Sequence, residues 1–268
     1  MPFKKQSSNF PEALVKHWEK SDGVNFAIAL GRLTGWMLQV DWLASEQHSL
    51  EADMTPVRVY VETNNDVIFD FTGKKSMKAF HKYVILPIGI KRSKTRSESI
   101  DTRCYSEQKL REMPLKVKAT EYEIEKATKD ILANTGYLSF IPKRQNPDIP
   151  AHIASQFSHG RCVPFAEALK DLSGLTAVGI SVMKYHEDCA NHLGFCHTVI
   201  QHTDGLVEDA WGKQTLQQVL DRFYIAEFEM SQEIFDFHRS RQQHEFPEIY
   251  KEAYEMAKNL LQSIEMKS

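Results

Sequence analysis

Apolar residues recur at helical spacing in the first part of the chain. Phe26 and Leu30 lie on one face of a predicted helix over about 24–34. Gly35 follows at the place where a glycine commonly ends a helix. A shorter helix is predicted before it, over about 11–20. The pattern therefore indicates two consecutive helices, joined by a turn.

Alternating apolar and polar positions come next. Residues 56–62, Pro-Val-Arg-Val-Tyr-Val-Glu, alternate as a strand with one buried face. Turn-forming residues at 63–66 separate this strand from the apolar run 67–70, so a β-hairpin is predicted. Three further segments complete this half of the chain: a helix near 75–84, an irregular polar stretch at 91–112, and a helix over 118–134.

The second half repeats this order of elements. Its predicted helices cover about 150–157, 162–172, 214–222 and 246–264, and its predicted strands cover 176–184, 195–201 and 206–210. The Asp204-Gly205 dipeptide between the last two strands is a strong signal for a hairpin turn. We therefore expect an α+β fold in which each half packs a helix on a small antiparallel sheet.

The two halves also align residue by residue. Residues 10–83 lie opposite residues 149–222 with a constant offset of 139 and no gap, so that Asp70 lies opposite Asp209. A period held over about seventy residues is the signature of a structural repeat. A chain of 268 residues is long enough for two such domains. We predict one domain over 1–138 and a second over 139–268.

Composition narrows the classes of partner. Hydrophobic residues make up 42% and charged residues 26% of the chain, which is ordinary for a soluble globular protein. The formal net charge of -3 argues against a nucleic-acid partner. No apolar run is long enough to span a bilayer, and we expect no membrane partner. A protein or peptide substrate is expected from the candidate chemistry and not from composition, whereas the oligomeric state does not follow from the sequence.

Cysteine usage and the N-terminus bear on location. The four cysteines follow no disulfide framework and no CxxC spacing, so reduced thiols and a cytoplasmic location are expected. The first ten residues hold two lysines without an apolar segment behind them, so no secretory signal is predicted. Delivery into a target cell by a route that needs no signal peptide is the alternative.

At the aligned positions, only the second half carries both a cysteine and a histidine. Cys162 lies opposite Gly23 and His197 lies opposite Arg58, whereas the aspartate is present in both halves. A cysteine is a nucleophile only as the thiolate, and a helix N-terminus or an imidazolium lowers its pKa. Cys162 is predicted at the start of a helix. His197 is predicted on a strand that can deliver its imidazole there.

Two further residues complete the candidate site. Asp209 is predicted on the partner strand of the His197 hairpin, where a carboxylate can orient the imidazole. Gln156, six residues before Cys162, can point its amide at an oxyanion. We expect the Cys162 sulfur within about 4 Å of one nitrogen of His197, with the other nitrogen facing Asp209. Because Asp70 has no nucleophile beside it, the aspartate can equally be structural in both halves.

These residues resemble a known superfamily. Gln156 and Cys162 resemble the oxyanion glutamine and the nucleophile of papain-like cysteine proteases. The compact order of Cys162, His197 and Asp209, together with the Asp204-Gly205 turn, is similar to the transglutaminase-like and deamidase branch. The resemblance covers about residues 149–222, and a degenerate copy of the same pattern covers 10–83.

The resemblance implies two tandem papain/transglutaminase-like units, of which 1–138 is a degenerate pseudoenzyme and 139–268 is catalytic. It implies acyl transfer on an amide: glutamine deamidation, transglutamination, or amide or isopeptide hydrolysis. Val163 stands where the proteases have an aromatic residue, which favours a selected side chain or bond over general proteolysis. Enzymes of this kind include bacterial and phage effectors and toxins, so an effector role belongs to the expectation.

Two alternatives stay open. The chain can be a non-catalytic protein-interaction module built from two papain-like units, with Cys162 as an ordinary core cysteine. The spacing His186-x2-Cys189-x2-His192 resembles part of a metal site, but a tetrahedral zinc site needs a fourth ligand. We therefore expect neither a metal nor an organic cofactor.

Overall fold

The chain folds into two compact units, unit 1 (Met1–Ile141) and unit 2 (Pro142–Ser268). The predicted boundary lay between residues 138 and 139. The computed structural model describes residues 10–45, 50–63, 67–93, 98–141, 144, 148–158, 160–186 and 193–265. Among these residues, no helix is both long enough and apolar enough to cross a membrane.

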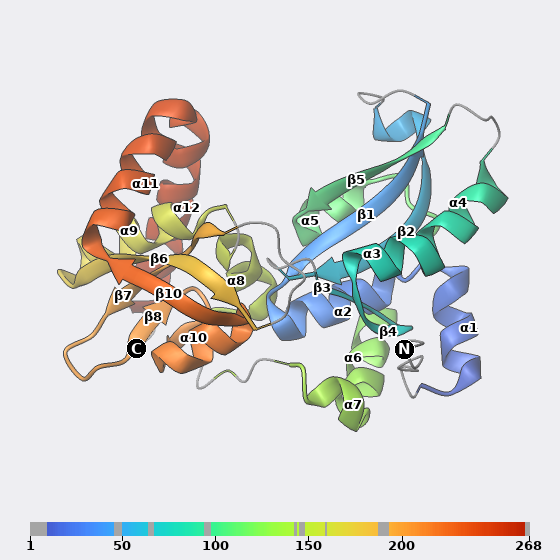
Figure 1. The fold of residues 1–268 in the computed structure, drawn as a ribbon, viewed down its shortest axis with the longest axis horizontal. Coiled ribbons are helices and arrows are strands. Elements are labelled where there is room, and N and C mark those ends of the chain that lie inside the picture. Colours follow the sequence, from blue (N-terminus) through green and yellow to red (C-terminus); the bar gives the residue numbers. More distant parts are fainter. Residues whose placement is uncertain are drawn as a thin grey trace. The chain divides into compact units, whose positions relative to one another are not determined.

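Unit 1 contains one antiparallel sheet with the strand order β4-β3-β2-β1-β5 (Figure 1). Its strands are β1 (Met37–Ala44), β2 (Thr55–Glu62), β3 (Val67–Asp70), β4 (Gly73–Ser76) and β5 (Ser99–Tyr105). Its helices are α1 (Glu12–Lys20), α2 (Val24–Thr34), η1 (Glu51–Asp53), α3 (Met77–Phe80), the π-helical turn η2 (His81–Ile85), α4 (Leu86–Arg92), α5 (Glu107–Glu112), α6 (Glu121–Ala133) and α7 (Thr135–Leu138).

Unit 2 contains a second antiparallel sheet, in the order β10-β6-β7-β8-β9. Its strands are β6 (Thr176–Tyr185), β7 (Gly194–Gln201), β8 (Val207–Asp209), β9 (Gly212–Gln214) and β10 (Ile225–Ser231). Its helices are α8 (Ala151–Ser158), α9 (Cys162–Ser173), α10 (Leu216–Arg222), α11 (Gln232–Glu245) and α12 (Pro247–Glu265). The predicted α+β class, with helices on a small antiparallel sheet in each half, is confirmed.

The strand register is the same in both units. Asp41 pairs with Arg58 in unit 1, and Ile180 pairs with His197 in unit 2, which is the same pair after the offset of 139. A β-bulge directly follows that pair in each sheet, between Asp41 and Trp42 and between Ile180 and Ser181. The repeat seen in the sequence is therefore a repeat of topology and register.

Helix ends repeat as well. Gly35 and Gly174 end α2 and α9 in the left-handed conformation, and each donates its backbone N–H to a carbonyl four residues earlier at 2.8 Å. Ser76 and Thr215 cap the N-termini of α3 and α10 with their side-chain oxygens. The same local signals thus set the same helix boundaries in both units.

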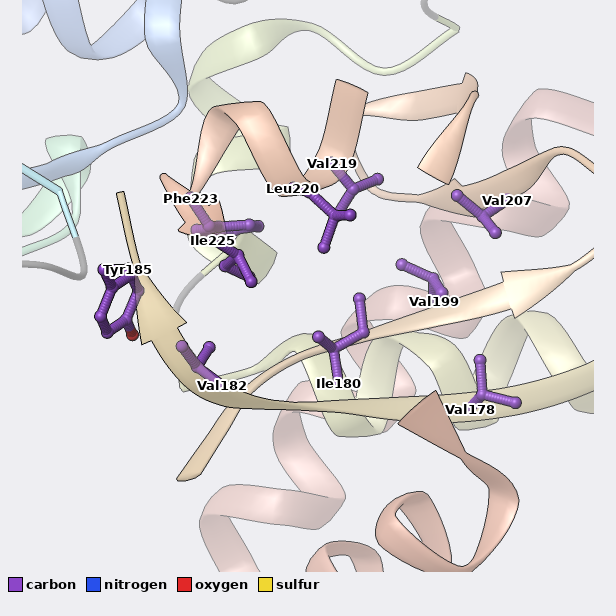
Figure 2. Close-up of a cluster of buried hydrophobic side chains, with 10 residues drawn as sticks. All are labelled: Val178, Ile180, Val182, Tyr185, Val199, Val207, Val219, Leu220, Phe223 and Ile225. Atoms are coloured by element: carbon purple, nitrogen blue, oxygen red, sulfur yellow. The ribbon is translucent and has the colours of Figure 1, made fainter. Parts of the chain in front are cut away.

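Hydrophobic packing holds α9 and α10 against the second sheet. Figure 2 shows Val219 and Leu220 of α10 pointing toward Ile180 and Val199 of the sheet, in a cluster completed by Val178, Val182, Tyr185, Val207, Phe223 and Ile225. A separate cluster packs α9 on the sheet through Val163, Ala166, Ala177, Ile200, Phe235 and Tyr250. Burial of these apolar surfaces fixes the start of α9 relative to β7.

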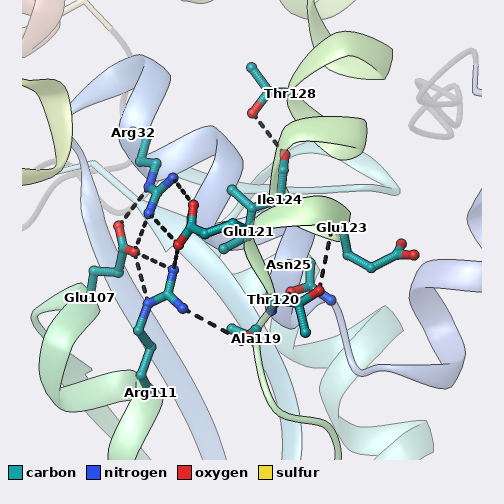
Figure 3. A network of polar contacts seen from close by, with 10 residues as sticks. All are labelled: Asn25, Arg32, Glu107, Arg111, Ala119, Thr120, Glu121, Glu123, Ile124 and Thr128. Atoms are coloured by element: carbon teal, nitrogen blue, oxygen red, sulfur yellow. Dashed lines mark hydrogen bonds and ion pairs between the residues drawn. The ribbon is translucent and has the colours of Figure 1, made fainter.

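In unit 1, charged side chains join α2 to α5 and α6 (Figure 3). Arg32 of α2 donates to Glu107 at 2.6 Å and to Glu121 at 2.8 Å. Arg111 donates to the same Glu107 at 2.8 Å. Because each arginine meets both glutamates, the four groups form a network rather than separate pairs.

Some elements were not predicted. The sequence-based assignment lacks the strands β1, β4, β5, β9 and β10 and the helices η1, α4, α5, α7 and α11. The segment 91–112 was expected to be irregular, but it contains β5 and α5, and α4 ends at Arg92 within it. β5 lies at the sheet edge and only its last residue, Tyr105, is buried, so its sequence lacks the apolar alternation of a half-buried strand.

Candidate active site

Cys162 is the first residue of α9. Gly160, two residues earlier, adopts the left-handed conformation with φ of 71°, which lets the chain turn into the helix. The side chain of Cys162 belongs to the cluster that packs α9 on the sheet, and the residue is only 4% exposed. The predicted position at a helix start is therefore observed, and the thiol is buried there.

The surroundings of the thiol keep it protonated. Burial raises the pKa of Cys162 to about 12, and nearby Cys196 adds to the increase. The hydroxyl and the backbone N–H of Thr198 act in the opposite direction. Among the residues that the structure describes, the Thr198 hydroxyl makes no hydrogen bond of ordinary geometry. At neutral pH the thiolate is consequently a very small fraction in this conformation.

His197 lies on β7, next to Thr198 in the chain. Its Nε2 is 2.7 Å from Oδ2 of Asp209, and its ring packs on Phe223 with the centroids 4.7 Å apart. The residue is 1% exposed. Its second nitrogen, Nδ1, is buried and has no hydrogen-bond partner among the described residues.

Asp209, the last residue of β8, is surrounded by donors. Its Oδ1 accepts from the backbone N–H of Trp211 at 2.8 Å and from the side-chain amide of Gln214 at 3.1 Å. Its Oδ2 accepts from His197 and also from the guanidinium of Arg222. A carboxylate with this many donors is held in one orientation.

Arg222 was not predicted as a site residue. It is the last residue of α10, is 3% exposed, and brings Nη2 to 3.5 Å from Nε2 of His197. A buried arginine needs a counter-charge, and Asp209 supplies it. The signal in the sequence was weak, because a basic residue in the last turn of a helix is commonly an exposed partner of the helix dipole.

The structure brings together two of the four predicted residues. His197 and Asp209 form the expected pair. No hydrogen bond joins the thiol of Cys162 to the imidazole of His197, although Thr198, the neighbour of His197, lies beside that thiol. Gln156 lies in the second turn of α8 and is partly buried. The arrangement is a histidine–aspartate–arginine cluster next to a separately buried cysteine.

The equivalent place in unit 1 has different chemistry. Gly23 stands where unit 2 has Cys162, and a Cβ atom at Gly23 would lie 2.8 Å from the carbonyl oxygen of Val59. Arg58 stands in place of His197, with Nη1 3.9 Å from Oδ2 of Asp70. Asp70 accepts from the backbone N–H of Thr72 at 2.8 Å, as Asp209 does from Trp211. The aspartate thus closes the same turn in both units.

A metal site finds no support in the described part of the chain, where no three histidine, cysteine, aspartate or glutamate side chains are grouped to hold an ion. Cys189 and His192, two of the three residues in the spacing His186-x2-Cys189-x2-His192, lie outside the described residues. Comparison with known proteins finds no matching family model, no matching curated protein and no matching solved structure. The function must therefore be argued from the geometry.

Proposed function

We propose that unit 2 is a cysteine-dependent acyl-transfer enzyme that acts on an amide, with Cys162 as nucleophile and His197 as base and acid. The observation that supports this most is the state of the imidazole. Asp209 holds Nε2 at 2.7 Å, while Nδ1 is buried and has no partner within the described part of the chain. An unpaired buried polar atom costs stability in a purely structural histidine, whereas a catalytic histidine needs one nitrogen available for the nucleophile.

The position of Cys162 supports the same proposal. The thiol sits at the first residue of α9, where the helix dipole favours a negative charge. It lies beside Thr198, whereas the ring of His197, the next residue along β7, packs on Phe223 at the other face of the sheet, so the two reacting groups meet only if β7 or α9 moves. Unit 1 has Gly23 and Arg58 at these two positions, so only unit 2 holds both reacting groups.

The buried thiol is the resting form in this proposal. Since burial raises its pKa to about 12, opening must bring Nδ1 of His197 and the substrate to the sulfur. The sulfur then gives its proton to Nδ1 and bonds to the amide carbon, and the carbon–nitrogen bond breaks as the amine takes that proton. Water or a second amine cleaves the thioester. Gln156 and the N–H of Cys162 would bind the oxyanion.

Alkylation of the thiols tests the proposal directly. The protein is treated with iodoacetamide near neutral pH, and the rate at each cysteine is followed by mass spectrometry. If His197 activates the thiol, His197→Gln should slow alkylation of Cys162 by at least about tenfold, the lower end of a general-base contribution. The rate at exposed Cys104 should not change, and His244→Gln, an exposed histidine, serves as the matched control.

The substrate class is a protein or peptide amide. Candidate proteins are exposed to the wild type and to Cys162→Ala, and their masses are compared. The amide-to-acid mass difference would mark deamidation, a cross-link would mark transglutamination, and fragments would mark hydrolysis. A cytoplasmic location belongs to this proposal, supported by Cys104, Cys162 and Cys196 all being free thiols. Effector delivery without a signal peptide is the alternative location.

A second candidate is the non-catalytic interaction module. It is favoured by the low exposure of Cys162 and by the missing hydrogen bond between its thiol and His197. In that case the histidine, Asp209 and Arg222 serve only to join β7, β8 and α10. Unchanged alkylation of Cys162 in His197→Gln would support this second candidate and overturn the first.

A further inference from the structure

Unit 1 carries a helical insertion that unit 2 lacks. In unit 2, α10 ends at Arg222 and β10 begins at Ile225. In unit 1, the equivalent α3 continues through η2 and α4 as far as Arg92, and β5 begins only at Ser99. Residues up to 83 align with unit 2, so the insertion consists of the end of η2 and of α4, residues 84–92. Because unit 2 completes the same sheet without such a segment, the shared topology does not need it.

The inner side of the insertion is firmly anchored. Ile85 and Gly89 are buried, and Ile85 belongs to a core cluster with Leu43 and Val57 of the sheet. Arg92, the last residue of α4, donates to both carboxylate oxygens of Asp22 at 2.5 and 2.8 Å. The insertion is therefore held in one orientation against the unit.

The outer side of the insertion is apolar and basic. Tyr83, Leu86 and Ile90, here called the outer stripe, are 65%, 41% and 77% exposed. Leu86 and Ile90, four residues apart in α4, share one side of that helix, and Tyr83 lies in the π-helical turn directly before it. The lysines at 78, 82 and 91 are also exposed, and residues 77–92 contain no aspartate or glutamate. Exposed apolar residues gathered in this way mark a contact surface.

We propose that the outer stripe and its flanking lysines bind the surface of an anionic lipid membrane. The exposed lysines at 78, 82 and 91 lie along the same helical segment as the stripe, and Nζ of Lys82 is 5.2 Å from the ring centroid of Tyr83. This is the pattern of an interfacial helix, whose apolar side chains enter the headgroup region while cations meet lipid phosphates.

The shape of the surface favours a lipid partner over a folded protein. The stripe runs along the outside of a helix, so a folded protein would need a groove to receive it. A fluid lipid surface needs none. We expected no membrane partner because the sequence has no segment that could span a bilayer. A missing transmembrane segment does not bear on peripheral binding, which needs none.

Vesicle binding tests the proposal. The full chain is mixed with vesicles of phosphatidylcholine alone or with added phosphatidylglycerol, and bound protein is measured by sedimentation. Binding should require phosphatidylglycerol and weaken at high salt. Each of Lys82→Gln and Lys91→Gln should weaken binding about fivefold, and Ile90→Asn about tenfold.

Matched variants in unit 2 provide the control. Lys251→Gln and Ile249→Asn change an exposed lysine and an exposed isoleucine of α12 and should leave binding unchanged. All variants lie on the surface, and melting curves verify that each is folded. Lack of binding to phosphatidylglycerol vesicles would overturn the proposal. So would equal binding to neutral vesicles, or an equal loss in the unit 2 variants. If self-association or binding to poly-glutamate depends on Ile90 and the lysines, and vesicle binding does not, the outer stripe binds a protein partner instead.

Discussion

His197 and Asp209 are joined by a buried contact of 2.7 Å between Nε2 and Oδ2, and this pair governs how both groups bind protons. Burial lowers the pKa of His197, and the charge of Arg222 contributes in the same direction, while Asp209 opposes both. Burial would raise the pKa of Asp209, but Arg222 and His197 outweigh it and hold that pKa well below its ordinary range. The folded protein therefore favours a neutral imidazole on an ionised carboxylate.

This pair should make stability depend on pH. A histidine whose pKa is lowered by folding binds fewer protons than the same histidine in the unfolded chain. Its contribution is complete above the unfolded pKa of about 6.5 and is lost as the pH falls below it. We expect the melting temperature to drop between about pH 7 and pH 5, and His197→Gln should reduce this slope.

Calorimetry of the two proteins across that range measures the effect. His244→Gln changes an exposed histidine and should keep the slope of the wild type. If the melting temperature of His197→Gln fell with pH as steeply as that of the wild type, His197 would not be the group that causes this pH dependence.

The two aspartates should differ in one respect only. Asp70→Ala and Asp209→Ala each remove the acceptor of a turn N–H and the counter-charge of a buried arginine, Arg58 or Arg222. Removal of one partner of a buried pair costs about 3–5 kcal/mol. Both variants should lower the free energy of unfolding measured with urea. Asp209→Ala alone should also slow alkylation of Cys162. If Asp209→Ala kept full stability and full thiol reactivity, the carboxylate would have no part in the site.

A methyl group at Gly23 should be poorly tolerated. The residue has φ of 82°, and an added Cβ would lie 2.8 Å from the carbonyl oxygen of Val59 and 3.1 Å from the ring of Phe71. Gly174 has a similar φ of 70° but open space around it, so Gly174→Ala isolates the backbone strain of about 1 kcal/mol. Gly23→Ala should lose clearly more stability than Gly174→Ala in urea unfolding. Equal losses would mean that β2 moves freely away from the helix start.

The charged network of unit 1 should contribute measurably. Arg32→Met leaves the buried Glu107 with fewer donors, and hydrogen bonds to charged groups contribute about 1.5–3 kcal/mol. Lys109→Met removes an exposed pair with Glu112 at 3.2 Å and should cost less than about 1 kcal/mol. Thermal or urea unfolding of the two variants gives the comparison. A loss from Lys109→Met as large as that from Arg32→Met would contradict the network.

The repeat made much of the fold predictable. Helix-ending glycines at 35 and 174 and the alternation in 56–62 are local signals, so they place α2, α9 and β2 within a few residues. The offset of 139 relates the elements of the two halves, although β1 was missed while its counterpart β6 was predicted. The sequence alone could not reveal β5 or β10, because edge strands bury few side chains and lack the alternation of central ones.

The candidate site was less predictable for a similar reason. The pairing of His197 with Asp209 follows from hairpin geometry, which the sequence specifies through Asp204-Gly205. Arg222 reaches the pair only because α10 packs on the sheet. The contact of Cys162 with Thr198 depends on how α9 packs on β7. Both are tertiary relationships between segments, and no local pattern encodes them.

The shared β-bulge bears on the history of the chain. The extra residue is Val57 in unit 1 and Cys196 in unit 2, and in each unit it directly precedes the position of Arg58 or His197. A backbone irregularity at the same aligned position in both copies is inherited more simply than acquired twice. A duplicated unit that already carried this bend would leave it in both copies. The backbone that presents the position is the same in both units, and only the side chain on it differs, Arg58 in one and His197 in the other.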